Sequence, residues 1–228
     1  MVAAATVVRL EPLKSGALST QVFERLRTAI FNGDLRPGDA LRELHVAREL
    51  RVSQATVREA LVQLEQFGLV VRTPNIGTHV TRLTPQDIRE RVALRMVLEE
   101  QALIEAAPRM TTADFAALDE RVGVLSDAIR RNAYFEQAQA DLAFHRFVWL
   151  RAGNRTLYRT LDQLAVPLFA FVSMLRGAHR QTLKDVVHSH EGIVQALRRG
   201  NRRLMRKAIH QHFHAGFSMP DTTPRAER

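Results

Sequence analysis

Asp141 and His145 stand four residues apart in the segment DLAFHRFVWLR, among large apolar side chains. Residues with this spacing lie on one face of an α-helix, and Leu142, Val148 and Trp149 fall on the same face. The pair therefore points toward a protein core, where a carboxylate costs free energy unless a charge or a hydrogen bond compensates it. Three kinds of site remain open: a plain ion pair, a catalytic carboxylate–histidine couple, or half of a metal site.

Helical periodicity also predicts which histidines of the last two helices face the interior. His190 falls on the apolar face of its predicted helix, whereas His188 falls on the polar face. In the last predicted helix His212 falls on the apolar face and His214 on the polar one. Four ionisable side chains on three predicted helices thus face the interior: Asp141, His145, His190 and His212.

Three neutral imidazoles and one carboxylate suit a divalent ion such as zinc, nickel or manganese. Taken singly, an inward histidine is more often a hydrogen-bonded core residue than a ligand. Three of them with one aspartate on facing helices make a chance arrangement harder to accept, and zinc is the first ion to expect at such a site. Such a metal would supply the positive charge that lets Asp141 lie inside the protein.

The charge of this site suits an anionic ligand. Three neutral histidines, one aspartate and a divalent ion leave it formally positive, with open positions that a carboxylate could fill. Arg95 shares a predicted helix face with Ile88 and Val92, so it is a candidate ligand-binding residue for the same anion. The alternative is that Arg95 only pairs with Glu99, four residues further along the helix.

From Thr84 and Pro85 onward, apolar residues recur at helical spacing and no convincing strand pattern occurs. Thr84 suits an N-cap and Pro85 suits the first turn of a helix. The predicted helices cover about 84–107, 112–131, 134–152, 154–177, 179–199 and 201–217. A bundle of helices can hold a site made by facing side chains. We therefore expect an all-α effector domain over residues 83–217.

The first third of the chain predicts a different unit. Helices are expected at 18–32, at 43–50 and from Ser53 to Gly68, followed by β-prone runs around the turn 74–77. Two short helices joined by a tight turn and followed by a hairpin form a winged helix-turn-helix, which we place at residues 18–82. The N-terminal residues of its last helix would reach bases in the major groove. The candidate DNA-binding residues are Gln54, Ala55, Thr56, Arg58, Asn75, Gly77, Thr78 and His79.

Composition limits the remaining possibilities. The chain of 228 residues is 46% hydrophobic and has no cysteine, so it can form a core but neither a disulfide nor a thiolate metal site. No signal peptide or membrane-spanning run is visible, so we expect a cytoplasmic protein without a membrane partner. The net charge of +9 supports a polyanionic partner only weakly, because most of the excess lies in residues 176–228. Residues 1–17 and 218–228 are expected to be flexible arms.

The winged unit resembles a known family. The segments IFNGDLRPGDAL (30–41), VSQATVREALVQLEQFGLV (52–70) and GTHV (77–80) are similar to the DNA-binding domain of GntR-type bacterial transcription regulators. That family usually has arginine where this chain has Gln54, and glycine where it has Asn75. A homodimer is the expected way to read two half-sites on double-stranded operator DNA.

The C-terminal part resembles the ligand-binding FCD domain of the FadR-like branch of this family. The similarity lies in RMVLE (95–99), DLAFH (141–145), HEGIVQAL (190–197) and AIHQH (208–212). In that branch, an aspartate and three histidines in these motif places hold a metal that helps to bind small organic acids. The resemblance thus implies the same metal-ligating role for the four inward residues and a small organic acid as effector.

These features predict a ligand-responsive transcription regulator rather than an enzyme, and we expect a repressor that a small carboxylate releases from DNA. Two alternatives remain open. A metal-dependent hydrolase with a DNA-binding appendage would need a general base, for which Glu99 and Glu191 are the nearby candidates. A metal-sensing regulator would instead respond to reversible loss of the ion itself.

Overall fold

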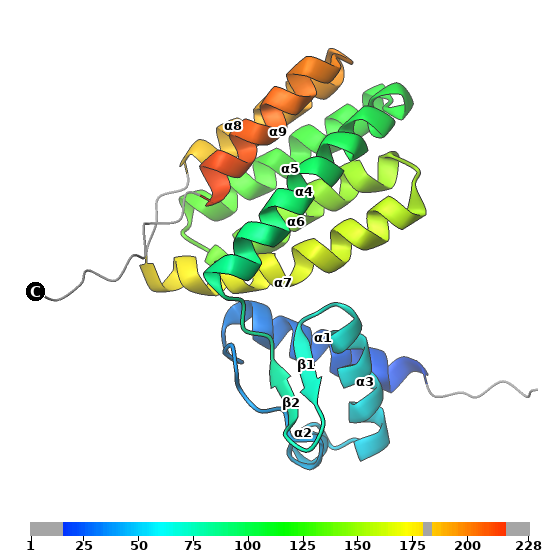
Figure 1. Ribbon diagram of the computed structural model, residues 1–228, viewed down its shortest axis with the longest axis vertical. Helices are drawn as coiled ribbons and strands as arrows, with labels where there is room; N and C mark the ends of the chain where they lie inside the picture. The colour runs from blue at the N-terminus through cyan, green and yellow to red at the C-terminus, as the bar shows by residue number, and fades with distance from the viewer. Residues whose placement is uncertain (1–15, 180–183, 218–228) are drawn as a thin grey trace, which may run out of the picture.

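Two groups of elements follow one another in the computed structural model, which describes residues 16–179 and 184–217 (Figure 1). The first group is α1 (Gly16–Asn32), α2 (Glu43–Leu50), α3 (Gln54–Gln66), β1 (Val70–Thr73) and β2 (Gly77–Val80). The second is α4 (Pro85–Ala106), a 3-10 turn (Ala107–Arg109), α5 (Thr112–Arg130), α6 (Tyr134–Arg151), α7 (Arg155–His179), α8 (Lys184–Arg198) and α9 (Arg202–Phe217). This confirms the predicted fold class, a winged helix-turn-helix followed by an all-helical domain. Of the expected arms, residues 1–15 and 218–228 lie outside the described part, whereas residues 16 and 17 already belong to α1.

The helix-turn-helix consists of α2 and α3. Arg51 ends α2 in the left-handed backbone conformation, with φ of 54°. Ser53 then caps α3, because its side chain accepts a hydrogen bond from the backbone N–H of Thr56. The inner face of α3 is fully buried and packs on α1; its buried residues are Val57, Ala60, Leu61 and Leu64. This packing fixes α3 against α1 and leaves its outer face exposed.

The wing is a tight antiparallel hairpin of β1 and β2, which runs from Val70 opposite Val80 to its tip. Asn75 and Gly77 near the tip have φ values of 62° and 109°, and both residue types tolerate a positive φ. The chain before α2 is tied to this hairpin, because the N–H of Leu41 donates to the carbonyl of Thr78 at 2.8 Å. The wing therefore sits beside the start of α2.

The helical domain is built around α6, which packs against α4, α5 and α7. Phe144 and Trp149 of α6 are fully buried in its core. α4 begins with a reciprocal cap between Thr84 and Asp87, and Pro85 occupies its first turn, as the sequence predicts. None of the described helices has the length and apolarity of a transmembrane segment.

The two groups of elements pack directly on each other, with α7 lying along the side of the helical domain that faces α1 (Figure 1). The rings of Phe31 on α1 and Phe135 on α6 meet edge to face, with centroids 6.3 Å apart. A Cβ atom on Gly68, just after α3, would lie 3.0 Å from Pro167 of α7. The helix that carries Asp141 is thus in contact with the winged unit.

Candidate metal centre and DNA-binding surface

The structure brings the four inward residues of the sequence analysis together from α6, α8 and α9. One ligand atom from each of them lies within 4.8 Å of the others. Their exposed fractions are 5% for Asp141, 2% for His145, 0% for His190 and 3% for His212. By contrast, the side chain of His188 is 91% exposed. The helical phase therefore separates inward from outward histidines as the sequence predicts.

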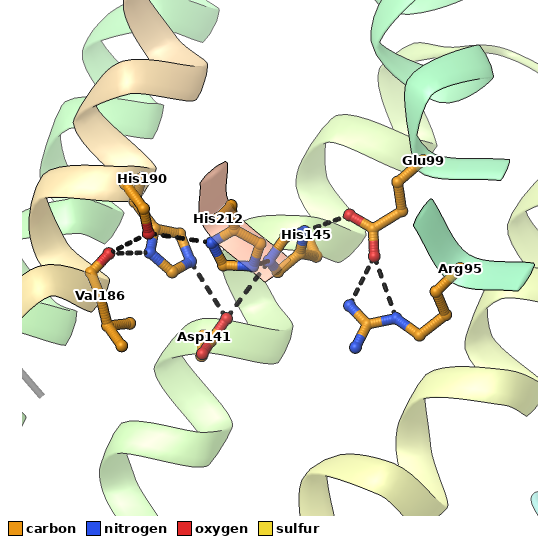
Figure 2. Close-up of polar contacts among 8 residues, drawn as sticks. Arg95, Glu99, Asp141, His145, Val186, His190 and His212 are labelled. Atoms are coloured by element: carbon orange, nitrogen blue, oxygen red, sulfur yellow. Dashed lines mark hydrogen bonds and ion pairs between the residues drawn. The ribbon is translucent and has the colours of Figure 1, made fainter. Parts of the chain in front are cut away.

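Hydrogen bonds fix which nitrogen of His145 and His190 faces the cluster. His145 donates from Nδ1 to Glu99 at 2.6 Å, and His190 donates from Nδ1 to the Val186 carbonyl at 2.7 Å (Figure 2). A carboxylate and a carbonyl can only accept, so both Nδ1 atoms carry the proton. The Nε2 atoms of both rings therefore point into the cluster as free lone pairs when the rings are neutral.

His212 is held in the same way by Ser189 of α8. The Ser189 hydroxyl donates to the carbonyl of Val186 at 2.7 Å and lies 3.1 Å from Nδ1 of His212. Because the Ser189 hydroxyl gives its proton to the Val186 carbonyl, its oxygen accepts the N–H of His212 Nδ1. Nε2 of His212 then faces the cluster too. Metal-binding histidines commonly donate their other ring N–H to such a partner.

Three of the distances between these atoms match those between ligands of one divalent ion. Nε2 of His145 lies 3.1 Å from Nε2 of His212 and 3.3 Å from Oδ1 of Asp141, which lies 3.1 Å from Nε2 of His190. Two ligands at about 2.1 Å from one ion, roughly 90–110° apart, would lie roughly 3.0–3.4 Å from each other. Two facing lone pairs at such a distance repel unless a cation or a proton lies between them. The donor set fits zinc, nickel or manganese.

Arg95 of α4 extends the cluster on one side. It is fully buried, and its Nε donates to Glu99 at 3.0 Å, so Glu99 links it to His145 (Figure 2). Its guanidinium carbon lies 4.8 and 5.0 Å from the ring centres of Phe169 and Phe213. Nη1 of Arg95 is buried without a hydrogen-bond partner among the described residues, and such a group is costly unless a ligand or water completes it. The sequence predicts the Arg95–Glu99 pair but gave no sign that Glu99 also reaches His145.

The candidate DNA-binding residues lie on α3 and on the wing. Gln54, Ala55 and Arg58 are exposed on α3, as are Asn75 and Gly77 on the wing, while Thr56 and His79 are partly exposed. Thr78 differs, because its side chain is buried at 8% exposure. Thr78 still lines the groove between α2 and the wing, but less of its side chain is accessible there than of the exposed candidates.

Comparison with known families assigns both parts of the chain. Residues 18–80 match the family described as "Bacterial regulatory proteins, gntR family", and residues 90–215 match the FCD domain. The chain belongs to the GntR family. It is therefore a transcription regulator with a winged helix-turn-helix and an FCD domain.

Relatives of this GntR protein extend over nearly its whole length. A "Probable D-xylose utilization operon transcriptional repressor" from Paenarthrobacter nicotinovorans is 30% identical, over 86% of this chain and 85% of the relative. The structure of Escherichia coli McbR/YncC shares the fold at 22% identity, with a TM-score of 0.76 over 88% of this chain and 95% of that one. A GntR regulator from Rhodococcus sp. RHA1 is 25% identical, with a TM-score of 0.71 over 86% and 93%.

Membership of this family makes the protein a DNA-binding regulator and not an enzyme, which excludes the hydrolase alternative. The two possible general bases agree with this result. Both oxygens of Glu99 are occupied, one by Arg95 and one by His145. Glu191 is half exposed beside His188, away from the buried cluster.

Without an ion, His145 in the cluster of this GntR regulator keeps a proton. Burial by itself would lower the pKa of His145, but the charges and hydrogen bonds of Glu99 and Asp141 outweigh it and raise that pKa to about 9. Burial, together with the neighbouring His190 and His145, holds the pKa of His212 well below its usual value of 6.5. His145 is therefore protonated at neutral pH when no ion is bound.

Metal binding to the cluster should strengthen as pH rises. The ion must displace the proton of His145, so the apparent affinity should increase about tenfold per pH unit and level off near pH 9. Competition against a chelating dye between about pH 6 and pH 8 measures this slope. His188→Ala, which changes an exposed histidine, should keep the same slope, and a pH-independent affinity would contradict the expected proton displacement.

Proposed function

We propose that this GntR protein is a homodimeric repressor whose binding to double-stranded operator DNA is modulated by a small carboxylate held at a metal site. In this proposal residues 18–82 bind DNA, with Gln54, Ala55 and Arg58 on α3 in the major groove. Residues 83–217 form the effector domain, in which Asp141, His145, His190 and His212 hold a divalent ion, zinc as first choice.

The observation that supports the proposal is the buried guanidinium of Arg95, which lies beside the cluster of three histidines and Asp141. Three neutral histidines, one aspartate and a divalent ion give a formally positive site. Arg95 adds an N–H group that has no partner among the described residues, four residues from Glu99, which holds His145. A carboxylate bridging the ion and Nη1 of Arg95 would satisfy both groups and offset the cost of the unpaired donor.

Contacts between the domains offer a route from this site to DNA. α6 carries Asp141 and His145 and also meets α1 through Phe135 and Phe31. A cavity of about 230 Å³ lies at the same junction, lined by α1 residues such as Arg27 and by α6 residues. An effector that favours one position of α6 would therefore change the placement of α3 by population shift.

We expect one small organic acid to raise the unfolding temperature of the metal-loaded protein. A ligand at about 100 times its Kd stabilises the folded state by about 2.7 kcal/mol, or roughly 5–10 °C for a chain of this size. Thermal unfolding against a panel of mono-, di- and hydroxy-carboxylic acids measures this shift. His190→Ala should abolish it, and Arg95→Gln should weaken it.

His188→Ala is the matched control, because it removes a histidine two residues away on the exposed face of α8. It should respond to the acid as the wild type does. If no acid shifts a protein that retains its metal, the carboxylate proposal is wrong. Operator binding that then depends on reversible removal of the ion would identify a metal sensor instead.

A further inference from the structure

The carboxylate of Glu43 on α2 binds two side chains of α3, the helix proposed to enter the major groove. Glu43, the first residue of α2, receives the guanidinium of Arg58, with Nη2 at 2.7 Å and Nε at 3.1 Å. It also receives Nε2 of Gln54 at 2.8 Å. The hydrogen bond from Arg58 is the main cause that lowers the pKa of Glu43, so Glu43 is ionised at neutral pH.

The charge of Glu43 determines which way the amide of Gln54 points. An ionised carboxylate only accepts hydrogen bonds, so the NH₂ group of Gln54 must face it. The amide oxygen is then directed away from Glu43, and one N–H of the same amide stays available. Glu43 and Gln54 line a groove of about 810 Å³ that extends to Gly77 and His79 of the wing.

An amide held in this way favours one base. Adenine presents an N–H donor and the N7 acceptor in the major groove, and glutamine pairs with both through its oxygen and one N–H. Guanine presents two acceptors there. With guanine, Gln54 could donate only its one free N–H, because its other N–H is held by Glu43, and its oxygen would find no donor.

Glu43 constrains Arg58 in a similar manner. The edge formed by Nε and Nη2 is occupied by the carboxylate, so only Nη1 and the second N–H of Nη2 can reach DNA. The negative charge of Glu43 also offsets the positive charge of Arg58 close to the phosphates. The pair thus weakens attraction to any DNA while it keeps a directed contact.

We propose that Glu43 is a positioning residue that sets the base specificity of α3, by orienting Gln54 toward adenine and Arg58 end-on toward the DNA. This inference rests on the proposed contact between α3 and DNA. Arg58 is more than half exposed, and surface ion pairs add little stability. The network is therefore better explained by positioning than by folding.

Selection from a randomised duplex library tests the inference on the full-length protein. Wild type should enrich a motif with adenine at one position of each half-site. With Glu43→Ala this preference over guanine should fall about tenfold, and affinity for unrelated duplexes should rise. Glu49→Gln is the matched control, because it removes the charge of an α2 carboxylate that lies 3.7 Å from the exposed His45. It should leave the base profile unchanged.

A second variant keeps the test decisive. In Gln54→Ala the adenine preference should vanish, and adding Glu43→Ala should change that position no further. Glu43→Ala that unfolds at the wild-type temperature but retains the wild-type base profile overturns the inference. A wild-type protein that enriches no motif overturns the proposed DNA contact itself, and the inference with it.

Discussion

Arg58→Ala should abolish sequence-specific DNA binding while the protein remains folded. Arg58 is exposed on the outer face of α3, where it can reach a base or a phosphate. Its removal also leaves the carboxylate of Glu43 unmasked at the same surface, because Arg58 is the cation that pairs with it. In the proposed dimer the lost contact and the new repulsion would act in both half-sites, so we expect a loss of about 100-fold or more.

Gel-shift titration against the duplex selected by the wild type measures this loss. Arg159→Ala on α7 is the matched control, because it removes the same charge from an exposed position of the other domain. It should bind within a few-fold of the wild type at equal salt. Arg58→Ala combined with Glu43→Gln should recover part of the affinity if the unmasked carboxylate matters. Specific binding retained by Arg58→Ala would show that α3 is not the reading element.

The cluster of Asp141, His145, His190 and His212 could be predicted from the sequence, because helical periodicity determines which side chains face inward. Asp141 and His145 share a face by their spacing, and His190 differs from His188 by 200° of helical rotation. Each helix has one apolar face, so inward residues of neighbouring helices must meet in the same core. Phase alone therefore predicted that the four residues lie inside.

Contacts between helices could not be predicted in this way. Glu99 reaches His145 from another helix, and Glu43 reaches Arg58 across the turn between α2 and α3. Such pairs depend on how two helices cross, which no spacing within one segment encodes. Thr78 illustrates a related problem, because the side of a strand that a residue occupies depends on register and on what covers the hairpin.

Glu99 connects Arg95 with His145, the two parts of the proposed effector site. One of its oxygens accepts from Arg95 and the other from His145. Its pKa is lowered to about 2: burial opposes this shift, and the charges of His145 and Arg95 outweigh it. An anion that pulls Arg95 toward the proposed metal site would therefore also act on the proposed ligand His145 and on α6.

Loss of the metal should lower the stability of the protein more than any surface substitution. An ion bound only to the folded state at about 1,000 times its Kd stabilises that state by about 4.1 kcal/mol, or roughly 8–16 °C for a chain of this size. Chelation of the wild type should therefore lower the unfolding temperature by about that amount. Asp141→Asn should have a similar effect, because it keeps the volume of Asp141 but removes the anionic ligand.

Combining the two changes separates metal loss from damage to the fold. Because Asp141→Asn has already weakened the site, a chelator should lower its unfolding temperature little further. Adding back zinc should restore the chelated wild type and not the variant at the same free zinc concentration. An unfolding temperature of the wild type that is unchanged by chelation, with the metal verifiably removed, would mean that the cluster is satisfied by the proton on His145 and needs no ion.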